Sequence, residues 1–388
     1  MILLRRFVPD LIVMAAGAAA LWLLGRWARQ FTASRPRAAV AGTLALWMSF
    51  GILAAGFFTT LLAWADSPFG HRWMMVRGVA FALGLSVCGM AAIAGLLRRS
   101  RGPGPLPPNA PVRREFLRTA LSAALVASPA AVMGFGILSG RRRFRLTEVD
   151  LAIANLPADL DGLRLVQLSD IHLSPFLSRA ELARCVDIAN TTRAHIALVT
   201  GDLVTGVRDS VDDCLEELKR LRSDAGTYGC LGNHEVYIHG EAYVAAEAAK
   251  SGMRFLRQQN TSLRFGSAYL NLAGVDFQPR RKTYLREAAG LRREGQFNLL
   301  LSHNPDVFPV AAAQGWNLTV AGHTHGGQLN VEIMRHNLNL ARLVTPYVYG
   351  AYREGNAAIY VTRGIGTISV PARIGADPEV ALLRLRRT

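Results

Sequence analysis

The sequence is poor in cysteine, and this shortage excludes two common kinds of site. Four cysteines occur in 388 residues, and no two of them form a C-x-x-C pair. Zinc knuckles and dithiol redox centres need such pairs, so neither is indicated. Cys88 lies in an apolar run, whereas Cys185, Cys214 and Cys230 are widely spaced in the rest of the chain. We interpret these last three as small buried residues.

Acidic residues are also scarce, numbering 28 against 44 basic residues, which leaves a net charge of +16. A basic balance of this size can indicate nucleic-acid binding. The chain lacks the basic stripe interleaved with aromatic residues that binds single strands, so we expect no nucleic-acid partner. Much of the excess instead stands beside apolar runs, at Arg98, Arg99, Arg101, Arg113, Arg114, Arg118, Arg141, Arg142, Arg143 and Arg145. We therefore attribute the charge to membrane topology.

Long apolar runs are absent after about residue 144, which indicates that the C-terminal part is a water-soluble domain. Before it, three uncharged runs reach the roughly 20 residues that a helix needs to cross a bilayer. They are Ala38 to Ala65, Gly78 to Leu97 and Thr119 to Gly140, with Leu11 to Gly25 as a shorter and weaker candidate. The sequence predicts about three transmembrane helices and a linker in residues 1–110, a final membrane helix in 111–143 and a soluble domain in 144–388.

Arginine placement predicts the orientation of the membrane part. The segment from Arg98 to Arg118 is rich in proline, glycine and arginine, which is typical of a flexible, extended linker. Its six arginines favour the cytoplasmic side, so the final helix would lead outward. Arg141 to Arg145 count against this orientation, but charge after the last helix is a weaker determinant. The stretch V-R-R-E-F-L-R at 112–118 resembles a twin-arginine export signal. We expect a multi-pass protein of the bacterial inner membrane with its soluble domain on the periplasmic or external face.

Within the soluble part, short apolar runs rich in β-branched residues alternate with helical stretches. Buried strands are predicted at Leu163 to Leu168, Ile196 to Val199, Leu299 to Leu301 and Leu318 to Ala321. Helices are predicted between some of them, at Arg179 to Ala189 and Val211 to Leu221. Such alternation implies an α/β core, in which sites form at the ends of the strands.

Polar clusters follow these strands, and they contain five of the nine histidines in the chain. The clusters are Ser169-Asp170-Ile171-His172, Thr200-Gly201-Asp202, Gly232-Asn233-His234-Glu235, Ser302-His303-Asn304 and Gly322-His323-Thr324-His325. Singly, each has an ordinary explanation, since Asp170 can cap a turn, Asn233 can occupy a left-handed turn and His303 can be a core histidine. His323 and His325 form a stronger pair, because alternate residues of an extended segment point the same way. Together, in loops that converge at one edge of a sheet, the clusters predict a metal site.

Seven side chains are candidate metal ligands, namely Asp170, His172, Asp202, Asn233, His303, His323 and His325. Seven groups are too many for one ordinary site, but with one bridging carboxylate they divide into two four-coordinate sets. Imidazole mixed with carboxylate and amide oxygen suits Mn, Fe or Zn better than Ca or Mg. Two such divalent ions can hold a bridging hydroxide and stabilise an in-line phosphoryl displacement. The glycines at 201, 232, 322, 326 and 327 would let the backbone approach the ions closely.

The order D-x-H, G-D, G-N-H-E, a single His and G-H-x-H resembles the calcineurin-like metallophosphoesterases over residues 144–388. The resemblance implies an α/β fold of four layers (αββα), with two mixed sheets flanked by helices, here preceded by an all-α transmembrane region. It also implies a dinuclear centre in which Asp202 bridges the two metals. The first metal would be held by Asp170, His172 and His325, and the second by Asn233, His303 and His323. His234 would be catalytic, protonating the leaving oxygen or stabilising the transition state.

A narrower resemblance points to a bacterial membrane-associated branch with exported members. It rests on Leu156-Pro157, on Asp161-Gly162-Leu163-Arg164 and on the tail from Tyr347 to Glu379 with its run Y-V-T-R-G-I-G. That branch includes phosphoesterases of the cell envelope and is similar to enzymes that cleave a nucleotide-sugar-lipid pyrophosphate. Thr205 stands where many members carry an acidic residue, and we expect little effect because the position is not a primary ligand.

The function that we expect is a membrane-anchored, dinuclear metal-dependent phosphoesterase acting on a phosphate ester or pyrophosphate of a small molecule or lipid. The alternative is a non-catalytic metal-binding protein whose membrane helices work as a transporter or sensor. Arg363 or Arg373 could clamp a phosphate, although a structural role in the tail is favoured. The basic segment from Phe277 to Arg293 could bind an acidic head group or form a solvated surface.

Overall fold

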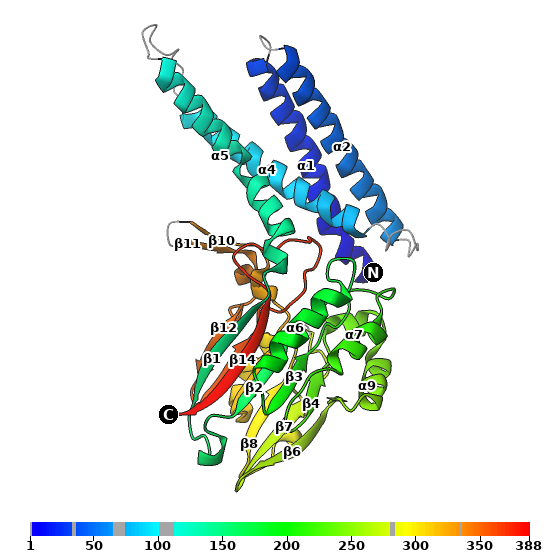
Figure 1. Ribbon diagram of the computed structural model, residues 1–388, viewed down its shortest axis with the longest axis vertical. Helices are drawn as coiled ribbons and strands as arrows, with labels where there is room; N and C mark the ends of the chain where they lie inside the picture. Colours follow the sequence, from blue (N-terminus) through cyan, green and yellow to red (C-terminus); the bar gives the residue numbers. More distant parts are fainter. Residues whose placement is uncertain (1, 33–35, 65–73, 101–111, 280–283, 334–335) are drawn as a thin grey trace. The chain divides into compact units, whose positions relative to one another are not determined.

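The computed structural model describes residues 2–32, 36–64, 74–100, 112–279, 284–333 and 336–388. The chain forms two compact units (Figure 1). The first comprises Met1–Leu138 with Ser369–Ala372, and the second comprises Ser139–Ile368 with Arg373–Thr388. Long helices make up the first unit, whereas two β-sheets with shorter helices make up the second.

The described part of the first unit contains long helices, as its apolar sequence predicts. They are α1 (Ile2–Thr32), α2 (Pro36–Trp64), α4 (Met74–Ser100) and α5 (Val112–Leu138). Among the described residues, three segments are long and apolar enough to cross a membrane, namely Thr43–Leu61, Met74–Leu97 and Ala120–Arg142. They coincide with the three long apolar runs of the sequence. The shorter run from Leu11 to Gly25 lies within α1, which is not among them.

α1, α2 and α4 pack against one another through small residues. Gly17 of α1 and Gly84 of α4 come so close that a Cβ on Gly17 would lie 2.7 Å from the Gly84 Cα. A Cβ on Gly56 of α2 would overlap the Cβ of Ala80 in α4. Small residues let helix backbones approach closely, which favours association in a membrane, where lipid tails are as apolar as the side chains. Larger apolar side chains complete this contact, including Met14, Leu21, Leu53 and Val87.

The prediction of an extended linker from Arg98 to Arg118 is wrong at both ends. α4 continues to Ser100 and α5 begins at Val112, so the pair Arg113–Arg114 lies in a helix. Arginine has a high helix propensity, and it therefore lengthens the helices beyond their apolar segments. Residues 101–111 of the predicted linker lie outside the described residues.

The second unit is built on two six-stranded mixed sheets. The first sheet consists, in spatial order, of β1 (Arg145–Ile153), β14 (Glu379–Arg387), β2 (Arg164–Leu168), β3 (Ile196–Thr200), β4 (Thr227–Cys230) and β5 (Arg254–Phe255). The second consists of β12 (Gly350–Glu354), β13 (Ala357–Val361), β9 (Leu318–Ala321), β8 (Phe297–Leu301), β7 (Ala268–Gly274) and β6 (Gln259–Phe265). Antiparallel pairs are β14 with β2, β12 with β13 and β6 with β7, and the other neighbours are parallel. A hairpin of β10 (Asn330–Ile333) and β11 (His336–Asn339) forms a separate pair.

Helices cover the outer face of each sheet, which confirms the four-layer α/β fold, and Figure 1 shows those of the first sheet. The first sheet packs against α6 (Arg179–Thr191), α7 (Val211–Leu218) and α9 (Glu241–Lys250). The second packs against α10 (Phe308–Gln314), and α8 (Asn233–Tyr237) follows β4. A central core between the two sheets includes Leu165, Leu198, Leu299 and Val320. Strands buried on both faces explain why these runs are continuously apolar in the sequence.

Local signals account for the ends of these helices. Ser178 begins α6 with a capping box, in which its hydroxyl accepts from the Glu181 N–H while the Glu181 carboxylate accepts from the Ser178 N–H. Ser210 caps α7 in the same way through its hydroxyl, but the helix ends at Leu218, three residues before the predicted end. α10 ends at Gly315, whose φ of 83° is the left-handed conformation that glycine adopts readily.

Candidate metal centre

The seven candidate ligands and His234 lie in the loops that follow β2, β3, β4, β8 and β9. Parallel pairing within each sheet brings the carboxyl ends of these strands to the same edge. Seven of the eight side chains meet there in three overlapping groups of three residues. Within each group, the ligand atoms lie within 4.8 Å of one another. The eighth, Asn233, is buried and immediately precedes His234 at the start of α8.

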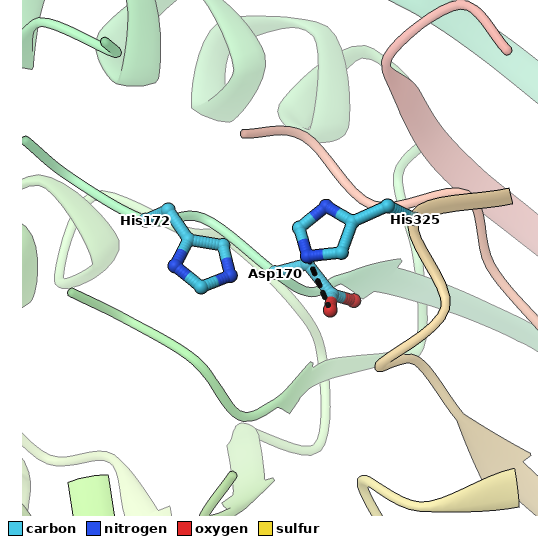
Figure 2. A group of neighbouring side chains, drawn as sticks. All are labelled: Asp170, His172 and His325. Atoms are coloured by element: carbon cyan, nitrogen blue, oxygen red, sulfur yellow. Dashed lines mark ion pairs between the residues drawn. The ribbon is translucent and has the colours of Figure 1, made fainter. Parts of the chain in front are cut away.

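The first group consists of Asp170, His172 and His325, and all three are buried (Figure 2). Nε2 of His325 lies 3.5 Å from Oδ1 of Asp170. The rings of His172 and His325 are stacked, with centroids 4.9 Å apart. Figure 2 shows the three side chains converging from two chain segments that are far apart in the sequence.

The second group consists of Asp202, His303 and His323. Nε2 of His303 lies 3.1 Å from Oδ2 of Asp202 and 3.2 Å from Nδ1 of His323. The same Asp202 oxygen lies 3.5 Å from Nε2 of His172, a member of the first group. A third group joins Asp202 and His172 to His234. Asp202 therefore stands between the two sets of ligands.

The second group brings a ring nitrogen and a carboxylate oxygen together in a way that favours a cation between them. Nδ1 of His303 donates a hydrogen bond to the Thr200 carbonyl oxygen at 2.6 Å, so in the neutral ring Nε2 offers only a lone pair. That nitrogen nevertheless faces a carboxylate oxygen of Asp202, which also offers only lone pairs. Burial alone would lower the pKa of His303, but Asp202 raises it to about 10, so a proton holds the two groups together when no metal ion is bound. A divalent cation would satisfy both ligand atoms in its place.

Two candidate ligand atoms are buried and have no hydrogen-bond partner among the described residues. They are Nε2 of His172 and Oδ1 of Asn233. Unpaired buried polar atoms are rare because they cost free energy, and a bound metal ion would remove that cost. Burial lowers the pKa of His323 to about 4 and that of His325 well below its usual range. Both rings are therefore neutral, the form in which imidazole binds metal, so the donor set fits metal binding.

Five candidate ligands adopt the left-handed backbone conformation. The φ angles are 50° for Asp170, 49° for His172, 56° for Asp202, 76° for His323 and 53° for His325. Such conformations cost on the order of 1–3 kcal/mol each outside glycine, and they cluster at functional sites where the surrounding structure holds them. The prediction that His323 and His325 point the same way from an extended segment is wrong, because both are left-handed and their rings enter different groups.

Backbone N–H groups orient the two carboxylates. The His323 N–H donates to both oxygens of Asp170, at 2.9 and 3.1 Å, and the His234 N–H donates to Oδ1 of Asp202 at 2.9 Å. The loops can approach this closely because Gly322 precedes His323, and a Cβ on Gly322 would overlap Oδ2 of Asp170. Hydrogen bonds of this kind orient ligands for a metal.

Glu235 belongs to the site, although the sequence motif G-N-H-E did not reveal its role. Its carboxylate is fully buried and accepts hydrogen bonds from the N–H groups of Asp202 at 2.9 Å, Leu203 at 2.7 Å and Gly232 at 2.7 Å. Glu235 thereby joins the loop after β3 to the loop after β4. It fixes the left-handed turn at Asp202 through hydrogen bonds from the backbone.

Thr205 contacts two histidines of the site, which the sequence alone did not indicate. Its hydroxyl lies 3.2 Å from Nδ1 of His172, and its carbonyl oxygen accepts from Nδ1 of His234 at 2.7 Å. The carbonyl contact is available to any residue, whereas the hydroxyl contact is specific to a side chain of this kind. Another residue at position 205 would therefore keep the contact with His234, whereas the contact with His172 depends on the hydroxyl.

Arg373 is buried and serves the fold, as the sequence favoured. Its guanidinium donates to the carbonyl oxygens of Gly366 at 3.0 and 2.5 Å, Ala376 at 3.0 Å and His325 at 3.3 Å. Burial lowers the pKa of Arg373 to about 10, which leaves the group charged at neutral pH. These bonds connect the loop of His325 to the C-terminal tail.

The basic segment from Phe277 to Arg293 is described only in part, since residues 280–283 lie outside the described residues. Its first residue belongs to the wall of the metal centre. The Phe277 ring packs against the rings of His303 and His323, with centroid distances of 6.1 and 5.5 Å. An apolar ring at this position covers the second ligand group from one side.

Residues 163–330 match the family of calcineurin-like phosphoesterases, and this region contains all eight candidate residues. The match covers less than half of the chain and lies within the second unit. The chain is 27% identical to the transmembrane protein with metallophosphoesterase domain of Bos taurus over 357 residues, which are 86% of this chain and 78% of that protein. It is 27% identical to the phosphodiesterase YaeI of Escherichia coli over 278 residues, which are 70% and 98% of the two chains. The structure of the NAD nucleotidase of Haemophilus influenzae is similar with 15% identity and a TM-score of 0.37, covering 53% of this chain and 45% of that one.

This family consists of metal-dependent phosphoric ester hydrolases, and the Escherichia coli relative is named a phosphodiesterase. The Bos taurus relative is named as a transmembrane protein, and three helices here are long and apolar enough to cross a membrane. Together these findings indicate that this metallophosphoesterase is associated with a membrane.

Proposed function

We propose that the protein is a membrane-anchored phosphoesterase with two divalent metal ions, which hydrolyses a phosphate ester or pyrophosphate. The observation that carries this proposal is the position of Asp202. Its Oδ2 lies 3.1 Å from Nε2 of His303 and 3.5 Å from Nε2 of His172, so one carboxylate serves both buried ligand groups. A pair of ions sharing a ligand needs such a carboxylate.

The close groups suggest how six of the residues divide between the two ions, and the family resemblance adds Asn233 to the second. Asp170, His172 and His325 would hold the first ion, Asn233, His303 and His323 the second, and Asp202 would bind both. Mixed nitrogen and oxygen donors favour Mn, Fe or Zn. When bound, such ions supply Lewis acidity, which polarises phosphoryl oxygens and lowers the pKa of water.

His234 is the residue that we assign to proton transfer. Its Nδ1 donates to the Thr205 carbonyl oxygen at 2.7 Å, so the transferable proton is the one on Nε2 of the protonated ring. The ring stands edge-on to His172 with centroids 4.5 Å apart, close to both ligand groups. Transfer of the Nε2 proton to the leaving oxygen would neutralise the charge that develops there.

We also propose where the reaction takes place. The arginines between Arg98 and Arg118 favour the cytoplasm, which would place the soluble unit on the periplasmic or external face of a bacterial inner membrane. An envelope lipid phosphate or a nucleotide-sugar lipid pyrophosphate is the substrate class that this location favours. Protease added to spheroplasts should then degrade the soluble unit, and complete protection of that unit would refute the orientation.

Hydrolysis by the purified full-length protein tests the proposal. With Mn²⁺ added, it should hydrolyse bis(4-nitrophenyl) phosphate. Asp202→Ala should lower kcat by about a thousandfold or more and reduce the bound metal, because both ions lose a ligand. Asp187→Ala is the matched control, since that carboxylate is exposed and pairs with Arg220 at 2.6 Å. Turnover by Asp202→Ala at the rate of the control would contradict the proposed mechanism.

A further inference from the structure

A cavity of about 320 Å³ lies beside β1 and β12, the outermost strands on one side of the two sheets. Its walls come from β1, from β12 with the residue before it, from β13 with the segment after it, and from the first residue of β14. The polar groups in these walls include Arg363 and the tyrosines Tyr349, Tyr352 and Tyr360. Small-molecule sites begin at about 300 Å³, so the cavity can hold one compact group. None of the candidate metal ligands lines it.

Arg363 connects this cavity to the metal centre. The next residue, Gly364, is packed so tightly that a Cβ on it would lie 3.0 Å from Oδ2 of Asp170. On the other side, a Cβ on Gly326 would lie 2.8 Å from Cγ of Arg363, and Gly326 directly follows His325. The side chain of Arg363 therefore leaves the backbone between two loops that carry ligands of the first group.

The Arg363 guanidinium is held in place but donates no hydrogen bond to any described residue. Its Cζ lies 4.6 Å from the centre of the Tyr349 ring, a cation–π contact that fixes the plane of the group. Nη1 lies 4.0 Å from Oε1 of Glu379, and 31% of the side chain is exposed. A guanidinium carries N–H donors along its whole edge, so several are available to a ligand.

Glu379 accepts no hydrogen bond from the N–H groups of the Arg363 guanidinium. Its carboxylate is buried and accepts from the Tyr360 hydroxyl at 2.6 Å, the Thr362 hydroxyl at 3.2 Å and the Arg363 backbone N–H at 2.7 Å. With three hydrogen bonds already made, the carboxylate positions the segment around Arg363. The guanidinium stays at ion-pair distance and keeps its N–H groups for another acceptor.

We propose that this cavity is a substrate subsite in which Arg363 binds a second phosphate group of the substrate, while the scissile phosphate lies at the metal centre. Guanidinium binds phosphate oxygens through paired N–H donors, and the Tyr349 ring behind it supplies a flat wall for the group that carries the phosphate. The inference rests on the proposed hydrolytic function and narrows its substrate to an ester or pyrophosphate that bears a further phosphate.

Two 4-nitrophenyl phosphodiesters of glycerol test this subsite, one with a free distal hydroxyl and one with a distal phosphate. The full-length protein should hydrolyse the second with a kcat/KM about tenfold higher, as one charge-assisted contact provides. Arg363→Gln should bring that ratio close to one. A purely structural role of Arg363 would lower both rates equally and keep the ratio, which would overturn the proposal. The control Arg384→Gln removes an arginine that pairs with Glu148 and Asp150, and it should change neither rate.

Binding to metal-free protein separates the subsite from the hydrolytic function. Calorimetry should detect glycerol 3-phosphate binding to the chelator-treated full-length protein, and Arg363→Gln should weaken it about tenfold. Equal binding by both proteins would overturn the subsite even where hydrolysis is observed. Lysophosphatidate in the same measurement distinguishes the source of the phosphate. If lysophosphatidate binds more tightly than glycerol 3-phosphate does, the subsite takes a lipid head group. If the two bind equally, it takes a soluble phosphate.

Discussion

Replacing Glu235 by glutamine should destabilise the soluble unit and disturb Asp202. The buried carboxylate accepts from the Leu203 N–H at Oε1 and from the N–H groups of Asp202 and Gly232 at Oε2. Glutamine has one carbonyl oxygen, so it can keep at most the two bonds at Oε2. Its NH2 group would then face the Leu203 N–H, donor against donor.

The magnitude follows from two buried donors left without an acceptor, the Leu203 N–H and the new NH2 group. Each such group costs about 1–3 kcal/mol, so the substitution should cost about 4 kcal/mol in the free energy of unfolding. In a domain of this size, 1 kcal/mol corresponds to about 2–4 °C, and the Tm should therefore fall by about 8–16 °C. Activity should fall as well, because the Asp202 and Leu203 backbone positions the shared carboxylate.

Thermal unfolding of the full-length protein in detergent, followed by circular dichroism, measures this shift. A chelator in both samples removes the contribution of metal binding to Tm. Glu247→Gln is the matched control, because its carboxylate is partly exposed and bonds to Lys250 on the surface of α9. The control should shift Tm by less than about 2 °C, as most surface substitutions do. A shift for Glu235→Gln no larger than that of the control would refute the hydrogen-bond argument.

Two further substitutions test the proton donor and the helix packing. His234→Gln keeps a donor for the Thr205 carbonyl oxygen but cannot transfer a proton. For a phenyl ester, kcat should therefore fall about 10²–10⁴-fold, and for a nitrophenyl ester it should fall less. The metal content should be unchanged. Equal losses for the two leaving groups would contradict the proton-donor role. Gly84→Leu should destabilise the full-length protein in detergent by about 1–3 kcal/mol, because a Cβ there would lie 2.9 Å from the Val13 carbonyl oxygen. Gly95→Leu in the same helix, where a Cβ meets open space, is the control, and an equal effect of both would argue against close packing at Gly84.

The fold class and the family were predictable because their signals are local in the chain. Apolar runs of about 20 residues indicate membrane helices by length alone. Short apolar strands followed by Asp170, Asp202 or His303 indicate sites at the end of a sheet, since each cluster directly follows its strand. The extended linker was mispredicted because proline and glycine content was averaged over a segment whose arginine-rich ends continue the helices.

By itself, then, the sequence determined which side chains were available to a metal and in which loops they stand. The family resemblance also implied how they divide between two metals, and the tertiary structure supplied the physical reason for that division. His323 and His325 are one residue apart yet enter different ligand groups, because left-handed turns and the packing of two sheets direct their rings. Glu235 and Arg363 gain their positions from contacts with loops far away in the chain. Such contacts depend on how strands distant in sequence pack together, and no local pattern of residues encodes that arrangement.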